Sequence, residues 1–327
     1  MLNLNITLIF MAYGAPGPLN FGVFFVTLVT YLATMFANII LMLLIYYDTS
    51  LHKPMYIFLF NLAMNGLIGS SAVLPNIMSN LVNNMKNISY NNCLLQVFFI
   101  NFYASCAYGI LTVMAYDRYV SICKPLQYHN IMTPAKVRLL IGAVYIFPMW
   151  FLAVQLYFTS MLPLCRYTIN KLFCDNLAVV SLACLKSALV DLYGLVGVVF
   201  FVVFPLALVI MSYVRILFVS LKASANAKKK ALKTCAPHLI TFINFSSASL
   251  FSVIYNRFSN YLPKELNVFM SIHFILIPPL LHPLIYGMRT ESIIKSLRKS
   301  LQKRIFAFEF HLKSEDNIKK SAFSCLN

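Results

Sequence analysis

Long apolar stretches without a charged side chain dominate the sequence. Seven of them exceed 20 residues and contain no Asp, Glu, Lys or Arg: Phe21–Tyr47, Pro54–Met85, Asn87–Tyr116, Leu139–Cys165, Leu192–Val214, Thr234–Asn256 and Leu266–Met288. An α-helix needs roughly 20 apolar residues to cross the hydrocarbon core of a bilayer. The pattern therefore predicts a chain that crosses a membrane seven times as helices.

The composition agrees with a membrane protein. Of the 327 residues, 60% are hydrophobic and 11% are charged, whereas soluble domains carry about a quarter charged residues. The segments between the stretches are too short for a soluble domain, and a membrane β-barrel would show short alternating strands instead. The predicted fold class is an all-α integral membrane protein with one seven-helix domain, residues 21–289. An N-terminal lead, residues 1–20, precedes it, and residues 290–327 follow.

Basic residues are distributed unevenly along this pattern. If the N-terminus lies outside, 20 of the 26 Lys and Arg side chains fall on the inner side and 6 on the outer side. The positive-inside rule then places the N-terminus outside the cell and the C-terminus in the cytosol. Anionic lipid and a cytosolic partner explain the net charge of +17 better than nucleic acid does.

Two further segments fit this orientation. Asn5-Ile6-Thr7 in the N-terminal lead is a glycosylation acceptor sequence. Between Glu291 and Leu301, apolar and basic residues recur on opposite helical faces, which predicts a short amphipathic helix on the inner leaflet.

Four of the eight cysteines fall on the outer side: Cys93, Cys165, Cys174 and Cys184. An oxidising compartment favours disulfides among them, and four cysteines allow three connectivities. On the inner side, Cys235 and His238 have helical spacing, but two ligands do not make a metal site. No metal or cofactor is expected.

A ten-residue motif ends the third stretch. Met114–Cys123, MAYDRYVSIC, resembles the MAYDRYVAIC signature of odorant receptors, a branch of the rhodopsin-like G-protein-coupled receptors. Leu51–Tyr56 resembles the first inner loop of that family. Lys230–Leu239 resembles the KAFSTCxSHL opening of its helix 6, and Pro278–Tyr286 resembles the end of its helix 7. The resemblance covers nearly the whole chain. The sequences of helix 2 and of the second inner loop resemble fish odorant receptors more than mammalian ones.

The resemblance implies a receptor rather than an enzyme. Such a receptor binds a small organic odorant within the bundle and activates a heterotrimeric G protein of the olfactory stimulatory type, which raises cyclic AMP. The expected location is the plasma membrane of olfactory cilia. The resemblance also implies the disulfides Cys93–Cys174 and Cys165–Cys184.

Family position implies two sets of site residues. The residues expected to switch and couple the receptor to a G protein are Asp117, Arg118, Tyr119, Tyr213, Pro283 and Tyr286. Those expected to line the ligand cavity are Ile100, Asn101, Ala104, Ser105, Tyr108, Gly197, Phe201, Ser249, Val253 and Ile272. On helix 3, Asn101, Ser105 and Tyr108 recur at i, i+4 and i+7 and form one polar stripe. With so few polar groups, the cavity suits a small organic molecule.

The chain departs from the family pattern at several places, and three of them concern the switch. Helix 2 has Asn65-Gly66 where many relatives carry a carboxylate, and His282 replaces the usual Asn of helix 7. Residues 215–238 contain no Asp or Glu, so like charges would push the inner end of helix 6 away from Arg118. We therefore expect a weak contact between helices 3 and 6 at the inner side.

Two other functions are alternatives. One is a rhodopsin-like receptor for a non-odorant small molecule. The other is a membrane transporter, which would favour ionisable residues in mid-helix or a repeated half. The sequence displays neither feature.

Overall fold

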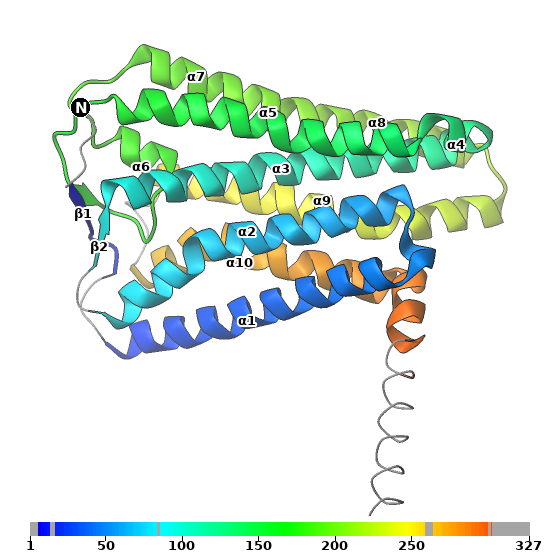
Figure 1. Ribbon diagram of the computed structural model, residues 1–327, viewed down its shortest axis with the longest axis horizontal. Helices are drawn as coiled ribbons and strands as arrows, with labels where there is room; N and C mark the ends of the chain where they lie inside the picture. Colours follow the sequence, from blue (N-terminus) through cyan, green and yellow to red (C-terminus); the bar gives the residue numbers. More distant parts are fainter. Residues whose placement is uncertain (1–5, 14–16, 84–85, 259–263, 300–301, 303–327) are drawn as a thin grey trace, which may run out of the picture.

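In the described part of the chain, seven long helical segments, which we call rods, lie side by side in a single bundle (Figure 1). The computed structural model describes residues 6–13, 17–83, 86–258, 264–299 and 302, with backbone alone at 19, 227, 230, 253–258 and 264–271. Six rods are single helices: α1 (Pro18–Tyr47), α2 (Pro54–Val82), α3 (Tyr90–Cys123), α5 (Pro134–Ser160), α9 (Ala225–Phe258) and α10 (Lys264–Arg289). The seventh rod runs through α7 (Ala188–Val198), the π-helix η3 (Val199–Val203) and α8 (Phe204–Leu221).

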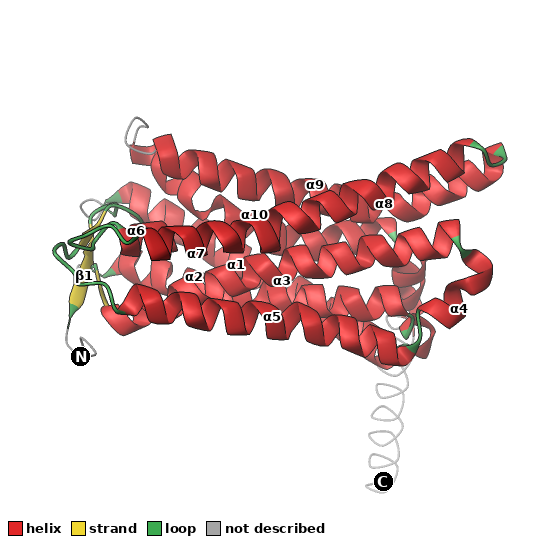
Figure 2. Cartoon of the chain, turned by 90° about the horizontal axis from the view of Figure 1, so that it is seen from above, coloured by secondary structure: helices red, strands yellow, loops and turns green. Residues whose placement is uncertain are grey.

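Short helices occupy the connections between the rods. They are η1 (Thr49–Leu51), η2 (Pro125–Gln127), α4 (Tyr128–Ile131) and α6 (Asn176–Val180). A further short helix at residues 291–299 follows α10. Figure 2 shows the strands at one end of the bundle and α4 at the other. We name these the β end and the α4 end.

Within the described residues, five rods are long and apolar enough to span a membrane by length and composition: residues 20–47, 54–82, 90–123, 134–160 and 188–221. α9 and α10 each contain residues whose side chains are not described, and they are not in this set. α9 nevertheless packs against α3 and α10, and α10 packs against α1 and α2. The prediction of a helical membrane bundle is confirmed.

The starts of the helices follow local sequence. Proline is the first residue of α1, α2 and α5, where its fixed φ suits a helix and its missing N–H costs no bond. Ser89 caps α3 by accepting a hydrogen bond from the Asn92 N–H at 3.3 Å. α1 begins at Pro18 rather than at Phe21, because the proline starts the helix before the apolar stretch does.

The β end also contains a small sheet, which the all-α prediction did not include. The strands are β1 (Thr7–Phe10), β2 (Asn87–Ser89) and β3 (Thr168–Ile169). β1 is central, antiparallel to β2 and parallel to β3. Strands of two to four residues are too short to show an alternating pattern in the sequence. Part of the predicted N-terminal lead is therefore an ordered strand.

The connection between α5 and α7 folds over the β end of the bundle. Disulfides join Cys93 to Cys174 and Cys165 to Cys184, which is the connectivity that the resemblance implies. The buried Gln96 side chain on α3 accepts a hydrogen bond from the Cys174 N–H at 2.8 Å. The connection is thus held to α3 by a covalent bond and by a backbone hydrogen bond.

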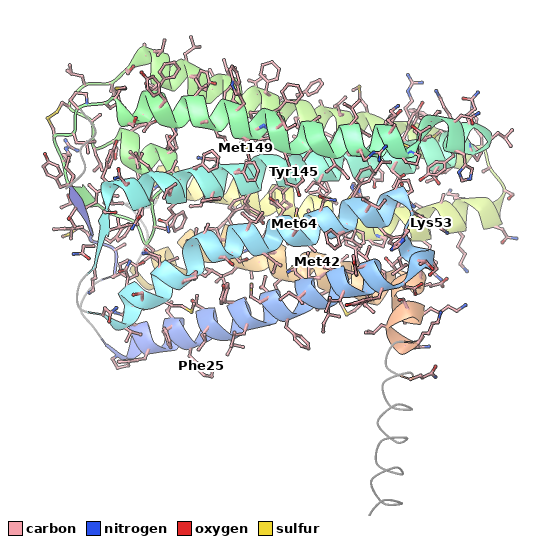
Figure 3. The ribbon with its side chains drawn as sticks, viewed as in Figure 1. Phe25, Met42, Lys53, Met64, Tyr145 and Met149 are labelled. Carbon is pink, nitrogen blue, oxygen red and sulfur yellow. A yellow bond between two sulfur atoms is a disulfide. The ribbon has the colours of Figure 1, made fainter. Side chains whose placement is uncertain are left out.

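Apolar side chains also cover the outside of the bundle. Phe25 points away from α1 (Figure 3) and is 65% exposed, and Trp150 on α5 is 71% exposed. Such a surface is unusual in water and suits the hydrocarbon of a lipid bilayer.

Replacing Phe10 with alanine should destabilise the β-end sheet. Phe10 is 2% exposed within an apolar cluster, and truncating a buried phenylalanine costs about 3 kcal/mol. The Met11 amide donates to the Ile169 carbonyl. Its hydrogen-exchange rate should rise about a hundredfold in the variant.

Ile9→Ala is the matched control. Ile9 is the neighbouring strand residue on the opposite face and is 48% exposed, so its truncation should change local stability by less than about 0.5 kcal/mol. Equal acceleration of exchange in both variants would contradict this account of the sheet.

Candidate functional site

A buried carboxylate organises the α4 end of α3. Asp117 is fully buried, and its Oδ2 accepts a hydrogen bond from Arg118 Nη2 at 2.6 Å. Its Oδ1 accepts one from the Tyr128 hydroxyl of α4 at 2.7 Å. Burial, and then the Asp117 charge, raise the pKa of Tyr128, so this hydroxyl stays protonated as a donor. Tyr128 was absent from the predicted switch residues, because only the fold brings α4 to α3.

Arg118 keeps an unused donor. Its Nε is buried and has no hydrogen-bond partner within the described part of the chain. Adjacent residues of a helix do not face each other squarely, so the pairing of Arg118 with Asp117 is through a single nitrogen. Arg118 therefore has donor capacity left for another acceptor.

His238 of α9 joins three helices. Its Nε2 lies 2.9 Å from the Leu111 carbonyl of α3, and its Nδ1 lies 2.6 Å from the Tyr213 hydroxyl of α8. A carbonyl only accepts, so we assign the proton to Nε2, and Nδ1 accepts from Tyr213. By sequence alone, His238 is a candidate only for metal binding, and this contact was not predicted. Its position inside the helix 6 motif was the available signal.

The predicted switch residues of α10 lie in the same half of the bundle. Pro283 and Tyr286 are buried, and Tyr286 belongs to the apolar cluster that contains Met114 of α3. Tyr119 and Tyr213 pack against this cluster from its edge. The predicted switch set is therefore gathered around one core at the α4 end.

Asn38 of α1 bonds a backbone carbonyl of α10 that has no partner within its own helix. Pro283 has no N–H, so the Pro279 carbonyl lacks its normal partner four residues along the helix. The Asn38 Nδ2 of α1 donates to that carbonyl at 3.0 Å. The Cys106 thiol of α3 likewise lies 3.4 Å from the Val144 carbonyl, which Pro148 leaves free in α5.

An aromatic cluster crosses the middle of the bundle. Phe245 of α9 is fully buried, and its ring lies 4.9 Å from Tyr108, 5.9 Å from Tyr103 and 5.5 Å from Phe274, centroid to centroid. His282 contacts the same ring at 6.0 Å. Phe245 therefore touches both α3 and α10.

Gly69 of α2 leaves the space that the Tyr103 ring of this cluster occupies. A Cβ at Gly69 would lie 2.5 Å from the Tyr103 ring, a distance that real atoms do not adopt. The Asn65 Nδ2 also donates to the Tyr103 carbonyl at 2.9 Å. α2 and α3 are thus in close contact beside the aromatic cluster.

The predicted ligand residues do not all lie in one place. Ile100, Ser105, Tyr108 and Ile272 are buried between the helices, Ala104 is half-buried, and the Ser249 Oγ is buried without a partner in the described region. Gly197 and Phe201 instead pack against Phe151 of α5. The Asn101 amide donates to the Val97 carbonyl of its own helix.

Two predictions cannot be placed. The Val253 side chain and Asn5 lie outside the described residues. Among the residues described, no group of three His, Cys, Asp or Glu side chains could hold a metal ion.

Comparisons with known proteins identify similar sequences. The family described as Olfactory receptor matches residues 27–304. Human Olfactory receptor 10A6 is 34% identical over 85% of this chain and 88% of its own length. Mouse Olfactory receptor 4E2 is 36% identical over 85% of this chain and 89% of its own length. Human Olfactory receptor 6Y1 is 32% identical over 92% of this chain and 94% of its own length.

Replacing Gly69 with alanine should destabilise the bundle by about 1–3 kcal/mol, because the added methyl group displaces the Tyr103 ring. The thermal unfolding of detergent-purified protein measures this effect. Gly142→Ala in α5 is the matched control, since a Cβ there meets its nearest atom only at 4.0 Å. An equal loss of stability in both variants would contradict the close α2–α3 packing.

Proposed function

The chain belongs to the olfactory receptor family, and from this premise we propose that it binds a small organic odorant within the helix bundle. Binding would activate a heterotrimeric G protein of the stimulatory class and raise cyclic AMP. The observation that carries the proposal is the joining of α3, α8 and α9 at His238, whose partner Leu111 lies about two turns along α3 from the Asp117–Arg118 pair.

A neutral odorant with one hydrogen-bonding group is the proposed ligand class. The residues between α3, α9 and α10 on the β-end side of Phe245 are mainly apolar, and they include Ile100, Ala104 and Ile272. The buried Ser249 hydroxyl has no partner among the described residues, and an unsatisfied buried hydroxyl gains by bonding a ligand. Ser105 and Tyr108 add two hydroxyls on α3.

Arg118 is the proposed contact for the G protein. In the ligand-free arrangement the Arg118 charge is held by Asp117, which Tyr128 also bonds. Outward movement of the α4 end of α9 would separate His238 from Tyr213 and Leu111. Arg118, with its unpaired Nε, would then be available to an acceptor on the partner, together with the neighbouring Tyr119, Tyr213, Pro283 and Tyr286.

The membrane arrangement is proposed with the β end outside. The distribution of Lys and Arg supports it, as do the two disulfides at the β end, because disulfides form in oxidising compartments. Residues 1–20 would be extracellular, residues 21–289 the receptor domain, and residues 290–327 cytoplasmic. Asn5 would carry a glycan, and the receptor would reside in the ciliary plasma membrane.

The function is tested with an odorant panel and a cyclic AMP readout in transfected cells. Among odorants that act on the wild type, Ser249→Ala should raise the half-maximal concentration by about three- to tenfold, the cost of one hydrogen bond. Ser247→Ala is the control, because Ser247 is exposed and bonds its own helix. No response to any odorant, with substrate flux independent of G proteins, would instead indicate a transporter.

Arg118→Ala should reduce odorant-stimulated cyclic AMP by about thirtyfold without changing surface expression. The loss corresponds to one charge-assisted hydrogen bond of about 2 kcal/mol to the partner. Arg138→Ala is the matched control, since Arg138 is an exposed arginine near the same end of the bundle. Undiminished signalling in Arg118→Ala would remove Arg118 from the coupling step.

A further inference from the structure

The α4 end of α9 has an acidic partner that the sequence pattern did not indicate. Lys233 of α9 forms an ion pair with Glu291, the first residue of the helix at 291–299. The hydrogen bond and the charge of Lys233 lower the pKa of Glu291. The carboxylate missing from residues 215–238 is thus supplied from beyond α10.

Lys233 is also a departure from the family motif. In the stretch Lys230–Leu239, which resembles KAFSTCxSHL, lysine occupies the position of the serine. The family motif therefore does not supply this ion pair. Lys229 is exposed on the same helix and has no ion pair among the described residues.

The helix that carries Glu291 is also attached to the connection between α1 and α2. Ile293 is 2% exposed and belongs to the same apolar cluster as Leu51 of η1. Asp48 precedes η1, and the hydroxyls of Ser296 and then Ser50 hold the pKa of Asp48 down at about 2. Glu291 therefore stands on an anchored helix, and its ion pair connects α9 to that anchor.

We propose that the Lys233–Glu291 ion pair holds the α4 end of α9 beside the helix at 291–299 and lowers ligand-free activity. The regulatory part rests on the proposed receptor function. The two side chains are 65% and 78% exposed, and exposed pairs are weak. The pair therefore changes the ratio of two positions of α9, closed beside the helix at 291–299 and open away from it, by up to about fivefold. It leaves α9 free to move when a ligand binds.

The position of α9 can be measured without any G protein. Spin labels are attached through Leu232→Cys and Ser292→Cys, both at exposed positions, with Cys123 and Cys325 replaced by serine. Pulsed electron paramagnetic resonance then gives the distribution of distances between α9 and the helix at 291–299. We expect Lys233→Ala and Glu291→Ala each to raise the longer-distance fraction, with an open-to-closed ratio up to about fivefold above wild type.

The charge-swapped double variant separates the ion pair from other effects of substitution. Lys233→Glu combined with Glu291→Lys should restore the wild-type distribution, and Lys229→Ala should leave it unchanged. Salt at about 1 M should move the wild type toward the single variants, because it screens exposed charges. Identical distributions in all variants, or no restoration in the swap, would overturn the proposal.

Ligand-free nucleotide exchange on the G protein tests the regulatory part. The exchange rate should rise in the two single variants and return in the swap. If α9 opens while basal exchange stays constant in a receptor that responds to odorant, the regulatory part is overturned. If no odorant drives exchange in the wild type, the proposed function fails, and the distance measurements still decide the ion pair.

Discussion

Within the hydrocarbon region, a backbone carbonyl that loses its helical partner has no water to bond instead. Proline creates such carbonyls in α5 and α10, and a side chain of a neighbouring helix contacts one of them in each helix. The Asn38 amide bonds the Pro279 carbonyl, and the Cys106 thiol lies against the Val144 carbonyl. Each of these two contacts also joins two helices, α1 to α10 and α3 to α5, so satisfying a backbone carbonyl contributes to the packing of both pairs.

α9 contacts its neighbours both in the middle of the bundle and toward the α4 end. Phe245 contacts Tyr108 of α3 and Phe274 of α10, and two turns away His238 bonds Tyr213 and the Leu111 carbonyl. A rigid helix that carries both contacts can transmit a displacement from the proposed ligand region to the α4 end. His282, which replaces the usual Asn, lies against the Phe245 ring and so belongs to this path.

The ends of the bundle differ in the strength of their connections. At the β end, two disulfides and a three-stranded sheet hold the connection between α5 and α7 and the N-terminal segment together. At the α4 end, hydrogen bonds and the exposed Lys233–Glu291 ion pair hold α9. Covalent bonds persist while exposed ion pairs open at little cost. This asymmetry favours movement at the α4 end.

The sequence by itself determined the helical bundle, because lipid allows only helices and closed barrels, and charge-free stretches of this length lack the short alternating strands of a barrel. It also located the Asp117–Arg118 motif and the four cysteines of the β end. The tertiary structure decided the contacts between distant segments: Tyr128 on Asp117, His238 on Leu111, β1 between β2 and β3, and Glu291 on Lys233. Hydrophobic periodicity reports which face of a helix is buried, and it carries no information about which polar side chain of another helix meets that face.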